Sequence, residues 1–567
     1  MLHEARQEND FWHAQMIPIN STYAPVQVLV EELVRSGMTH AVTCPGSRNA
    51  PLALTLAAHP SIEAISVLDE RSAGFVALGI AKQTGRPVAI TTTSGTAAAN
   101  LMPAVVEAHE AAIPLVVLTA DRPPELREVG AGQAIDQIKL YGSYVKLFVE
   151  VGNHEPGRAS AIHHRQLGCR AYATASGGRP GPVHLNFPLR EPLAPRPEEL
   201  DPADWEGRDG GRPWTAAVAA ERRVGAPPIA GARHGLIVCG GGAGGLAVDA
   251  LHLGRRLGWP VLAEPTSGVR WGSDVNGESN VIAHYDLLLR SEPFAAERPD
   301  IVIRVGEMPT SKPLRAWLEG CRQIVVDPYF DWHDPTRTAE TIAGALPEIS
   351  SDPVPAWLER WRAADAVVPD LLAGTEEPFE PLAYNVLADL ADTVWVSSSL
   401  PIRDVESYFP RTERPIRFLA NRGANGIDGV VSSAAGAALA AEAPVHLVIG
   451  ELALLHDIGG LIGARRAGAR LAILCVNNGG GGIFDFLPVA EQADPRAYEQ
   501  HIATPVDADL ATVAALGGLR HHPATTAAEV RELLRPGTLV ELRVSRAESL
   551  RRHRELAARV TARLDSL

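Results

Sequence analysis

Apolar runs of strand length alternate with helix-length amphipathic patterns in three blocks of the chain. The blocks extend from Ala24 to Ala120, from Gly235 to Asp327 and from Thr393 to Arg543. Repeated strand–helix–strand alternation favours parallel sheets, because each helix returns the chain to the edge where the previous strand began. The pattern therefore predicts an α/β protein with three parallel-sheet domains.

Two segments interrupt this alternation. Residues 196–234 are rich in Pro, Gly, Arg and Asp, and residues 350–381 mix Pro with acidic residues around a helical pattern from Trp357 to Ala366. Such compositions are typical of connections between domains. We therefore expect domains at 1–195, 235–349 and 382–567, joined by linkers at 196–234 and 350–381.

Oxygen-bearing side chains follow two successive strand patterns in the last block. Gly450-Glu451 ends the apolar run Val445–Ile449, and Asn477-Asn478 ends the run Leu471–Val476. Parallel strands joined by a right-handed crossover end at the same sheet edge, so Glu451 and Asn478 can converge. The glycines at 479–482 let backbone approach a ligand there, and such hard oxygen donors suit Mg²⁺ shared with a diphosphate. The alternative is an ordinary acidic turn followed by a glycine-rich turn.

Glu70 falls at the start of a helix in the first block. The extended pattern Ile62–Val67 precedes it and the helical pattern Gly74–Ala81 follows it. The simplest interpretation is a favourable interaction between an anion and the helix dipole, of about 0.3–1 kcal/mol. A role in chemistry requires further context.

Five stretches supply that context by their resemblance to a known family. The spacing from Glu451 to Asn478 is similar to the metal and diphosphate motif of thiamine-diphosphate enzymes. More specifically, the chain resembles the 2-succinyl-5-enolpyruvyl-6-hydroxy-3-cyclohexene-1-carboxylate synthase family. The matching stretches follow the order of the family's motifs and span most of the chain. The matching stretches are residues 44–52, 92–97, 119–126, 421–429 and the window from Gly450 to Asn478.

The resemblance implies the fold, with pyrimidine, central and diphosphate domains, and the reaction. The family decarboxylates 2-oxoglutarate on thiamine diphosphate and adds the succinyl carbanion equivalent to isochorismate in menaquinone biosynthesis. Both substrates carry several negative charges, and guanidinium groups bind carboxylates bidentately. The family's substrate-binding residues fall on Ser47, Arg48, Arg122, Lys312 and Arg422, and its catalytic residues fall on Glu70, Gln133, Ser399 and Arg403.

The positions of the arginines favour this role over the alternative of solvated surface charges. Arg48 and Arg122 each follow an apolar run within segments rich in Pro, Gly or Asp, and Arg403 and Arg422 do the same in the last third. Such segments are typical of strand-end loops at one edge of a parallel sheet.

The cofactors implied by the resemblance are thiamine diphosphate and Mg²⁺ or Mn²⁺. In this family a glutamate at the position of Glu70 hydrogen-bonds the aminopyrimidine ring and promotes loss of the thiazolium proton. Ile427, Phe484 and Leu487 would form apolar contacts with the cofactor, although ordinary core packing is the alternative for these three. The cofactor-binding set is Glu70, Ser94, Gly95, Ile427, Glu451, Asn478, Gly480, Phe484 and Leu487, of which Glu451, Asn478 and Gly480 would bind the metal.

Composition narrows the remaining function classes. The formal charge is 52 minus 67, or −15, which argues against nucleic acid or an anionic membrane as the main partner. The five cysteines show no metal-binding or disulfide spacing, and neither a signal-type leader nor an apolar membrane segment is evident. We therefore expect a cytoplasmic protein with small-molecule substrates and no stable membrane anchor. The glycine-rich segment Val238–Gly245 is similar to a dinucleotide loop, but we discount it, because the pattern is short and no acidic residue closes a clear ribose site, Glu264 being the nearest candidate.

Assembly and two alternatives complete the expectations. In the thiamine-diphosphate fold the cofactor lies between the first domain of one protomer and the third domain of its partner, which implies a homodimer as the minimum and favours a homotetramer.

One alternative function is that of another thiamine-diphosphate carboligase or decarboxylase, similar to acetolactate synthase. The other is an inactive regulatory paralogue, because Glu451 stands where the family has Asp and Gly459 stands where it has Asn.

Overall fold

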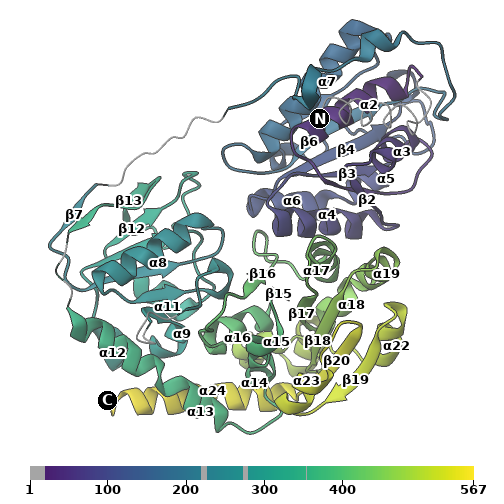
Figure 1. Ribbon diagram of the computed structural model, residues 1–567. Coiled ribbons are helices and arrows are strands. Elements are labelled where there is room, and N and C mark those ends of the chain that lie inside the picture. Colours follow the sequence, from purple (N-terminus) through teal and green to yellow (C-terminus); the bar gives the residue numbers. More distant parts are fainter. Residues whose placement is uncertain (1–19, 219–226, 273–278, 351, 353, 567) are drawn as a thin grey trace. The chain divides into compact units, whose positions relative to one another are not determined.

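The structure is a computed structural model that describes residues 20–218, 227–272, 279–350, 352 and 354–566. Within these residues the chain forms two compact units. The first contains the described part of Met1–Ala220 together with Asn421–Glu442 and Asp457–Ala469, and the second contains the remainder. Figure 1 shows the helices and strands of each unit.

The first unit is built on a parallel sheet of six described strands in the order β2-β1-β3-β4-β6-β5. Its central strands are buried along their whole length, as expected for a sheet covered on both faces. The strands are β1 (His40–Thr43), β2 (Glu63–Ser66), β3 (Val88–Thr92), β4 (Leu115–Asp121), β5 (Phe148–Glu150) and β6 (Val183–Pro188). The helices are α2 (Tyr23–Arg35), α3 (Ala50–Ala58), α4 (Glu70–Thr84), α5 (Thr96–Ala99), α6 (Met102–Glu110), α7 (Arg158–Ser176), α17 (Val430–Leu439) and α19 (Ile458–Ala467).

The second unit contains two more parallel sheets, each with six described strands. The sheet of the middle block has the order β10-β9-β8-β11-β12-β13. Its strands are β8 (Gly235–Cys239), β9 (Val261–Ala263), β10 (Val281–Ile282), β11 (Ile301–Val305), β12 (Gln323–Val326) and β13 (Ala339–Ala343), and β7 (Ile229–Ala230) pairs separately with β14 (Ile349–Ser350). The helices of this block are α8 (Gly245–Leu257), α9 (Tyr285–Leu288), α10 (Glu292–Ala296) and α11 (Lys312–Leu318).

The sheet of the last block has the order β16-β15-β17-β18-β20-β19. Its strands are β15 (Thr393–Val396), β16 (Arg417–Leu419), β17 (Val445–Gly450), β18 (Leu471–Asn477), β19 (Arg520–Ala524) and β20 (Thr538–Arg543). The helices are α14 (Glu380–Asn385), α15 (Leu387–Leu390), α16 (Leu400–Tyr408), α18 (Glu451–His456), α20 (Val489–Gln492), α21 (Pro495–Tyr498), α22 (Leu510–Leu516), α23 (Ala527–Leu533) and α24 (Arg546–Leu564). The prediction of three parallel-sheet α/β domains is confirmed, while the exact domain boundaries stay a prediction.

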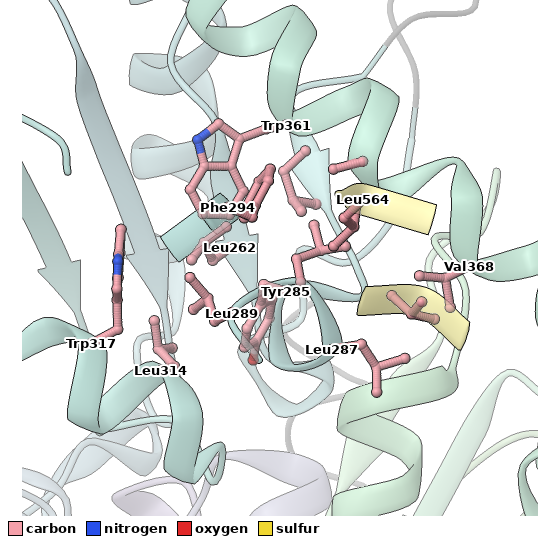
Figure 2. Packing of buried hydrophobic residues seen from close by; sticks show 14 of the residues in the cluster. Leu262, Tyr285, Leu287, Leu289, Phe294, Leu314, Trp317, Trp361, Val368 and Leu564 are labelled. Atoms are coloured by element: carbon pink, nitrogen blue, oxygen red, sulfur yellow. The ribbon is translucent and has the colours of Figure 1, made fainter. Parts of the chain in front are cut away.

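The segment expected to be the second linker is largely helical and contributes to a core. It forms α12 (Pro355–Asp365) and α13 (Val367–Ala373), and its residues Trp357 and Trp361 are buried. Figure 2 shows Trp361 edge-on to Phe294, with ring centroids 4.9 Å apart, beside apolar residues of α9 and α24. Aromatic side chains of this size bury enough apolar surface to hold a segment in place despite its polar composition.

Among the described residues, no helix combines the length and apolar character that crossing a bilayer requires.

Close packing of α4 against α17 depends on two glycines in the first unit. A Cβ atom at Gly79 would lie 2.0 Å from the carbonyl oxygen of Ser433, and one at Gly436 would lie 2.1 Å from the carbonyl oxygen of Val76. Both obstacles are backbone atoms, which cannot rotate away. Larger residues at these positions would force the helices apart.

We expect Gly436→Ala to lower the melting temperature, because the added methyl group must displace α4, at a cost of about 1–3 kcal/mol. The matched control is Gly463→Ala in α19, where the nearest described atom to an added Cβ is a methyl of Val67 at 3.7 Å. That change should be neutral or stabilising by roughly 0.5–1 kcal/mol, because alanine favours the helix. Thermal unfolding of both variants tests the packing, and a higher melting temperature for Gly436→Ala would contradict it.

Candidate active site

Three neighbouring strands of the first sheet end in loops that carry sequence-predicted site residues. Ser47 and Arg48 follow β1, Ser94 and Gly95 follow β3, and Arg122 follows β4. The first two loops are in close contact, because a Cβ at Gly46 would lie 2.4 Å from the Cβ of Thr93. The carboxyl ends of β1, β3 and β4 therefore bring these residues to one edge, as the sequence predicts.

A hydrogen-bond chain joins several of these loops. Arg122 Nη1 donates to Ser94 Oγ at 3.0 Å, and Ser94 Oγ donates to the carbonyl oxygen of Gln133 at 2.8 Å. Gly95 has a φ of +85°, which favours glycine, and its N–H donates to Gln137 Oε1 at 2.9 Å. Gln137 is buried and was not predicted from the sequence; no motif distinguishes it from other glutamines.

Arg48 combines burial with a nearby second cation. Its Nη1 donates to the carbonyl oxygen of Leu189, and its Nη2 lies 3.2 Å from Glu191 Oε1. Burial, followed by the positive charge of Arg122, lowers the pKa of Arg48. Its Nε is buried and has no hydrogen-bond partner among the described residues. Two guanidinium groups near one another, with a donor left over, form a suitable site for a carboxylate.

Glu70 is the first residue of α4 and lies near the end of β1. The preceding Asp69 caps the helix by accepting hydrogen bonds from the backbone N–H groups of Arg71 and Ser72. Burial raises the pKa of the Cys44 thiol, and the negative charges of Glu70 and Asp69 raise it further. Glu70 itself is half-buried within its unit. Its position in the first helical turn agrees with the sequence prediction.

A buried glutamate positions the loop that carries Arg422 and Ile427. Glu107 of α6 accepts hydrogen bonds from the N–H groups of Gly423, at 2.9 Å, and Ala424, at 2.6 Å. Burial raises the pKa of this carboxyl group, and the two N–H groups oppose that shift. Arg422 and Ile427 are half-buried. Sequence reasoning missed Glu107, because nothing in α6 marks one glutamate as the partner of a distant loop.

In the second unit, Ser399, Glu451 and Asn478 follow the adjacent strands β15, β17 and β18. Ser399 has a φ of +78°, a strained value for a residue with a side chain, and directly precedes α16. Arg403, one turn into α16, donates from Nη1 to the carbonyl oxygen of Ser399. Backbone strain of this kind is typical of functional sites.

The residues predicted to bind a metal offer a compatible set of oxygen atoms. Glu451 is buried, and its Oε1 accepts a hydrogen bond from the N–H of Gly480 at 2.6 Å. Burial raises the pKa of Glu451, and the N–H groups of the loop at residues 478–480 oppose that shift. Asn478 Oδ1 is buried and has no hydrogen-bond partner among the described residues. A carboxylate, an unpaired amide oxygen and a glycine carbonyl are the hard donors that Mg²⁺ and Mn²⁺ accept.

The glycine-rich loop at this site tolerates no larger residue at Gly480. Its φ is +140°, and a Cβ there would lie 2.7 Å from the carbonyl oxygen of Ala503. The described residues contain no cluster of three or more His, Cys, Asp or Glu that could hold a metal. A metal at Glu451 would therefore depend on amide and carbonyl oxygens as well.

The remaining predicted residues of the second unit have more open positions. Phe484 lies in the short 3-10 helix η6 (Gly482–Phe486) and is exposed, and the following Leu487 is half-buried. Lys312 is the first residue of α11 and is also exposed. The predicted site residues divide between the two units. The first unit contains Ser47, Arg48, Glu70, Ser94, Gly95, Arg122, Gln133, Arg422 and Ile427. The second contains Lys312, Ser399, Arg403, Glu451, Asn478, Gly480, Phe484 and Leu487.

A cavity and a glycine-rich loop of the second unit involve none of these residues. A cavity of about 440 Å³ is lined by side chains that include Arg362, Asp365 and Arg411. The glycine-rich loop after β8 is filled by the chain itself, because a Cβ at Gly240 would lie 1.8 Å from the carbonyl oxygen of Glu307. Glu264, the residue considered for a ribose, instead accepts hydrogen bonds from Gly241 and Thr310.

Two regions of the chain match models of known families. Residues 25–140 match the N-terminal TPP binding domain of thiamine pyrophosphate enzymes, and residues 403–538 match the C-terminal TPP binding domain. Thiamine pyrophosphate is thiamine diphosphate, and the two matched regions contain the loops after β1, β3 and β4 and the Glu451–Asn478 window. The chain thus carries both cofactor-binding domains of a thiamine-diphosphate enzyme.

Curated relatives match along nearly the whole chain. The 2-succinyl-5-enolpyruvyl-6-hydroxy-3-cyclohexene-1-carboxylate synthase of Geobacillus kaustophilus is 43% identical, covering 94% of this chain and 97% of the relative. The synthase of the same name from Myxococcus xanthus is 42% identical, covering 95% and 97%. The chain belongs to the 2-succinyl-5-enolpyruvyl-6-hydroxy-3-cyclohexene-1-carboxylate synthase family of thiamine-diphosphate enzymes.

Proposed function

We propose that this chain decarboxylates 2-oxoglutarate with thiamine diphosphate and transfers the remaining succinyl unit to isochorismate, in menaquinone biosynthesis. The observation that carries the proposal is the identity with synthase relatives over 94% of the chain. The loops after β1 and β4 support it, because they place Arg48 beside the positive charge of Arg122. Both proposed substrates are carboxylates that such a pair can bind.

When bound, thiamine diphosphate supplies a nucleophilic carbon and an electron sink for the loss of carbon dioxide from a 2-oxo acid. Glu70 would hold and exchange a proton at the aminopyrimidine ring nitrogen, while Ser94, Gly95 and Ile427 would contact the cofactor. Glu451, Asn478 and Gly480 would hold Mg²⁺ or Mn²⁺ against the diphosphate, with Phe484 and Leu487 as apolar contacts.

The substrates require cationic and polar groups. Arg48, Arg122, Lys312, Arg403 and Arg422 would bind their carboxylates, and the loss of any one removes a charge-assisted hydrogen bond. Ser47, Gln133 and Ser399 would orient the uncharged oxygens of the substrates. We further propose a cytoplasmic homodimer as the minimum active unit, assembled into a homotetramer.

Glu70→Gln should lower the rate of isochorismate consumption by at least about 100-fold, because an amide cannot exchange the proton that a carboxyl group exchanges. The assay follows isochorismate absorbance with 2-oxoglutarate, thiamine diphosphate and Mg²⁺. Glu63→Gln is the matched control, since that glutamate lies on the neighbouring β2 with its side chain 59% exposed. Equal rates in wild type and Glu70→Gln would contradict the assignment.

Asn478→Ala should raise the Mg²⁺ concentration needed for thiamine diphosphate to increase the melting temperature, by at least about tenfold. The adjacent Asn477 provides the control, because its Nδ2 donates to Glu541 Oε1 at 2.8 Å and has no proposed metal role. Asn477→Ala should lower the melting temperature with or without metal and keep the Mg²⁺ dependence. The metal assignment is wrong if the two variants require the same Mg²⁺ concentration as wild type.

Co-expression of Glu70→Gln and Asn478→Ala chains should restore activity if each site takes its two cofactor-binding halves from different protomers. Mixed assemblies are purified through two different tags. In a two-fold symmetric dimer of the two variants, one of the two sites has both halves intact, so we expect roughly a quarter to a half of the wild-type rate. Sedimentation velocity gives the assembly size. Mixed assemblies no more active than the single variants would contradict a shared site.

A further inference from the structure

A single buried carboxylate connects two elements of the second unit that carry proposed substrate-binding residues. Helix α11 begins at Lys312, and helix α16 begins just after Ser399 and includes Arg403. The short helix α9 contacts both of them and contains Asp286. Asp286 is 3% exposed, and no sequence motif marks it.

The carboxylate of Asp286 accepts hydrogen bonds from both neighbouring elements. Its Oδ1 accepts from Ser311 Oγ at 2.6 Å, and its Oδ2 accepts from Ser407 Oγ at 2.9 Å. Ser311 is the N-cap of α11, and its Oγ also accepts from the N–H of Leu314 at 3.1 Å. The same hydroxyl thus starts α11 and ties it to Asp286, and Ser407 ties α16 to the same carboxylate. Hydrogen bonds to an ionised acceptor are stronger and more directional than neutral ones.

Other buried groups of the same block hold the C-terminal end of α16. Arg270 Nη1 donates to the carbonyl oxygens of Val405, Glu406 and Phe409, at 3.1, 2.9 and 3.1 Å. The hydroxyl of Tyr285, which precedes Asp286, donates to Glu406 Oε1 at 2.7 Å. Arg270 therefore binds carbonyl groups at a helix end, where intrahelical partners run out.

Apolar packing keeps α9 from shifting. Figure 2 shows Tyr285 and Leu287 of α9 within the same buried cluster as Leu314 of α11. Because both sides of Asp286 on this short helix are anchored in the core, its carboxylate has little freedom to follow a displaced serine. The network can hold α11 and α16 at one fixed separation.

We propose that Asp286 is a positioning residue that sets the first turn of α11, with Lys312, relative to α16, with Ser399 and Arg403. The proposal rests on the proposed function, since it assigns Asp286 to the binding of that reaction's carboxylate substrates. Asp286 contacts no substrate; it acts through Ser311 and Ser407. Its effect is therefore on substrate affinity and alignment, and cofactor binding at Glu451 and Asn478 is unaffected.

The test compares Asp286→Asn with Arg290→Gln. The asparagine keeps the size of the side chain, but its amide nitrogen cannot accept a hydrogen bond from a serine hydroxyl. Arg290 donates to the same carboxylate through a side chain that is 46% exposed and, among the described residues, forms no hydrogen bond with either serine, which makes Arg290→Gln the matched control. We expect Asp286→Asn to raise the KM of at least one substrate by about tenfold or more, with the half-saturating concentration of thiamine diphosphate unchanged. Arg290→Gln should keep the wild-type KM values.

Ser311→Ala and Ser407→Ala keep the proposal testable if Asp286→Asn folds poorly. Each should give part of the KM increase, and neither should add to the effect of Asp286→Asn, because they interrupt the same connection. KM values equal to wild type in all three variants, with only the melting temperature lowered, would overturn the positioning role.

A binding measurement separates this outcome from failure of the proposed function. Calorimetry of the holoenzyme with glutarate, which has both carboxylates of 2-oxoglutarate and no oxo group, reports affinity without turnover. A wild type that does not consume isochorismate refutes the proposed function. A wild type that does, together with an Asp286→Asn variant of unchanged KM and glutarate affinity, refutes only the role of Asp286.

Discussion

Parallel strand direction is the constraint on which the candidate site depends. Because every strand of a parallel sheet ends at the same edge, residues far apart in sequence meet wherever adjacent strands end. The loops after β1, β3 and β4 bring Arg48, Ser94 and Arg122 together, and the loops after β15, β17 and β18 do the same for Ser399, Glu451 and Asn478. An antiparallel sheet would send alternate loops to opposite edges and would separate these groups. The strand order and direction alone therefore bring each group of loops together, whatever side chains the loops carry.

Once the loops meet, backbone shape and buried charge determine how closely they can approach a ligand. Gly46, Gly95 and Gly480 occupy positions where a side chain would clash or strain the backbone. The N–H groups at residues 478–480 surround the buried carboxylate of Glu451 and oppose the rise in its pKa that burial causes. The N–H of Gly480 donates to Oε1 of this carboxylate at 2.6 Å, so the loop itself holds Glu451 in place.

Periodicity and strand-end position predicted the parts of the site that depend on local sequence. Glu70 at the start of α4, and Glu451 and Asn478 after β17 and β18, lie where the apolar runs indicate. Glu107, Gln137 and Asp286 could not be predicted in this way, since each contacts a segment distant in sequence and none belongs to a repeated pattern. Composition also does not reveal that Trp357 and Trp361 of the segment at residues 350–381 are buried, because prolines and acidic residues dominate its pattern.

The net charge of −15 and the cationic site are compatible because electrostatic interactions in salt solution are local. The Debye length is about 8 Å at physiological ionic strength, so acidic groups on distant surfaces contribute little to the potential at Arg48 and Arg122. Burial has the opposite effect at the site, because it removes the water that would screen the two guanidinium groups from each other. Burial lowers the pKa of Arg48 and the positive charge of Arg122 lowers it further, while the carboxylates of Glu191 and Asp121 oppose the shift. A bound carboxylate would act in the same direction as Glu191 and Asp121, because a nearby negative charge favours the charged form of a guanidinium group.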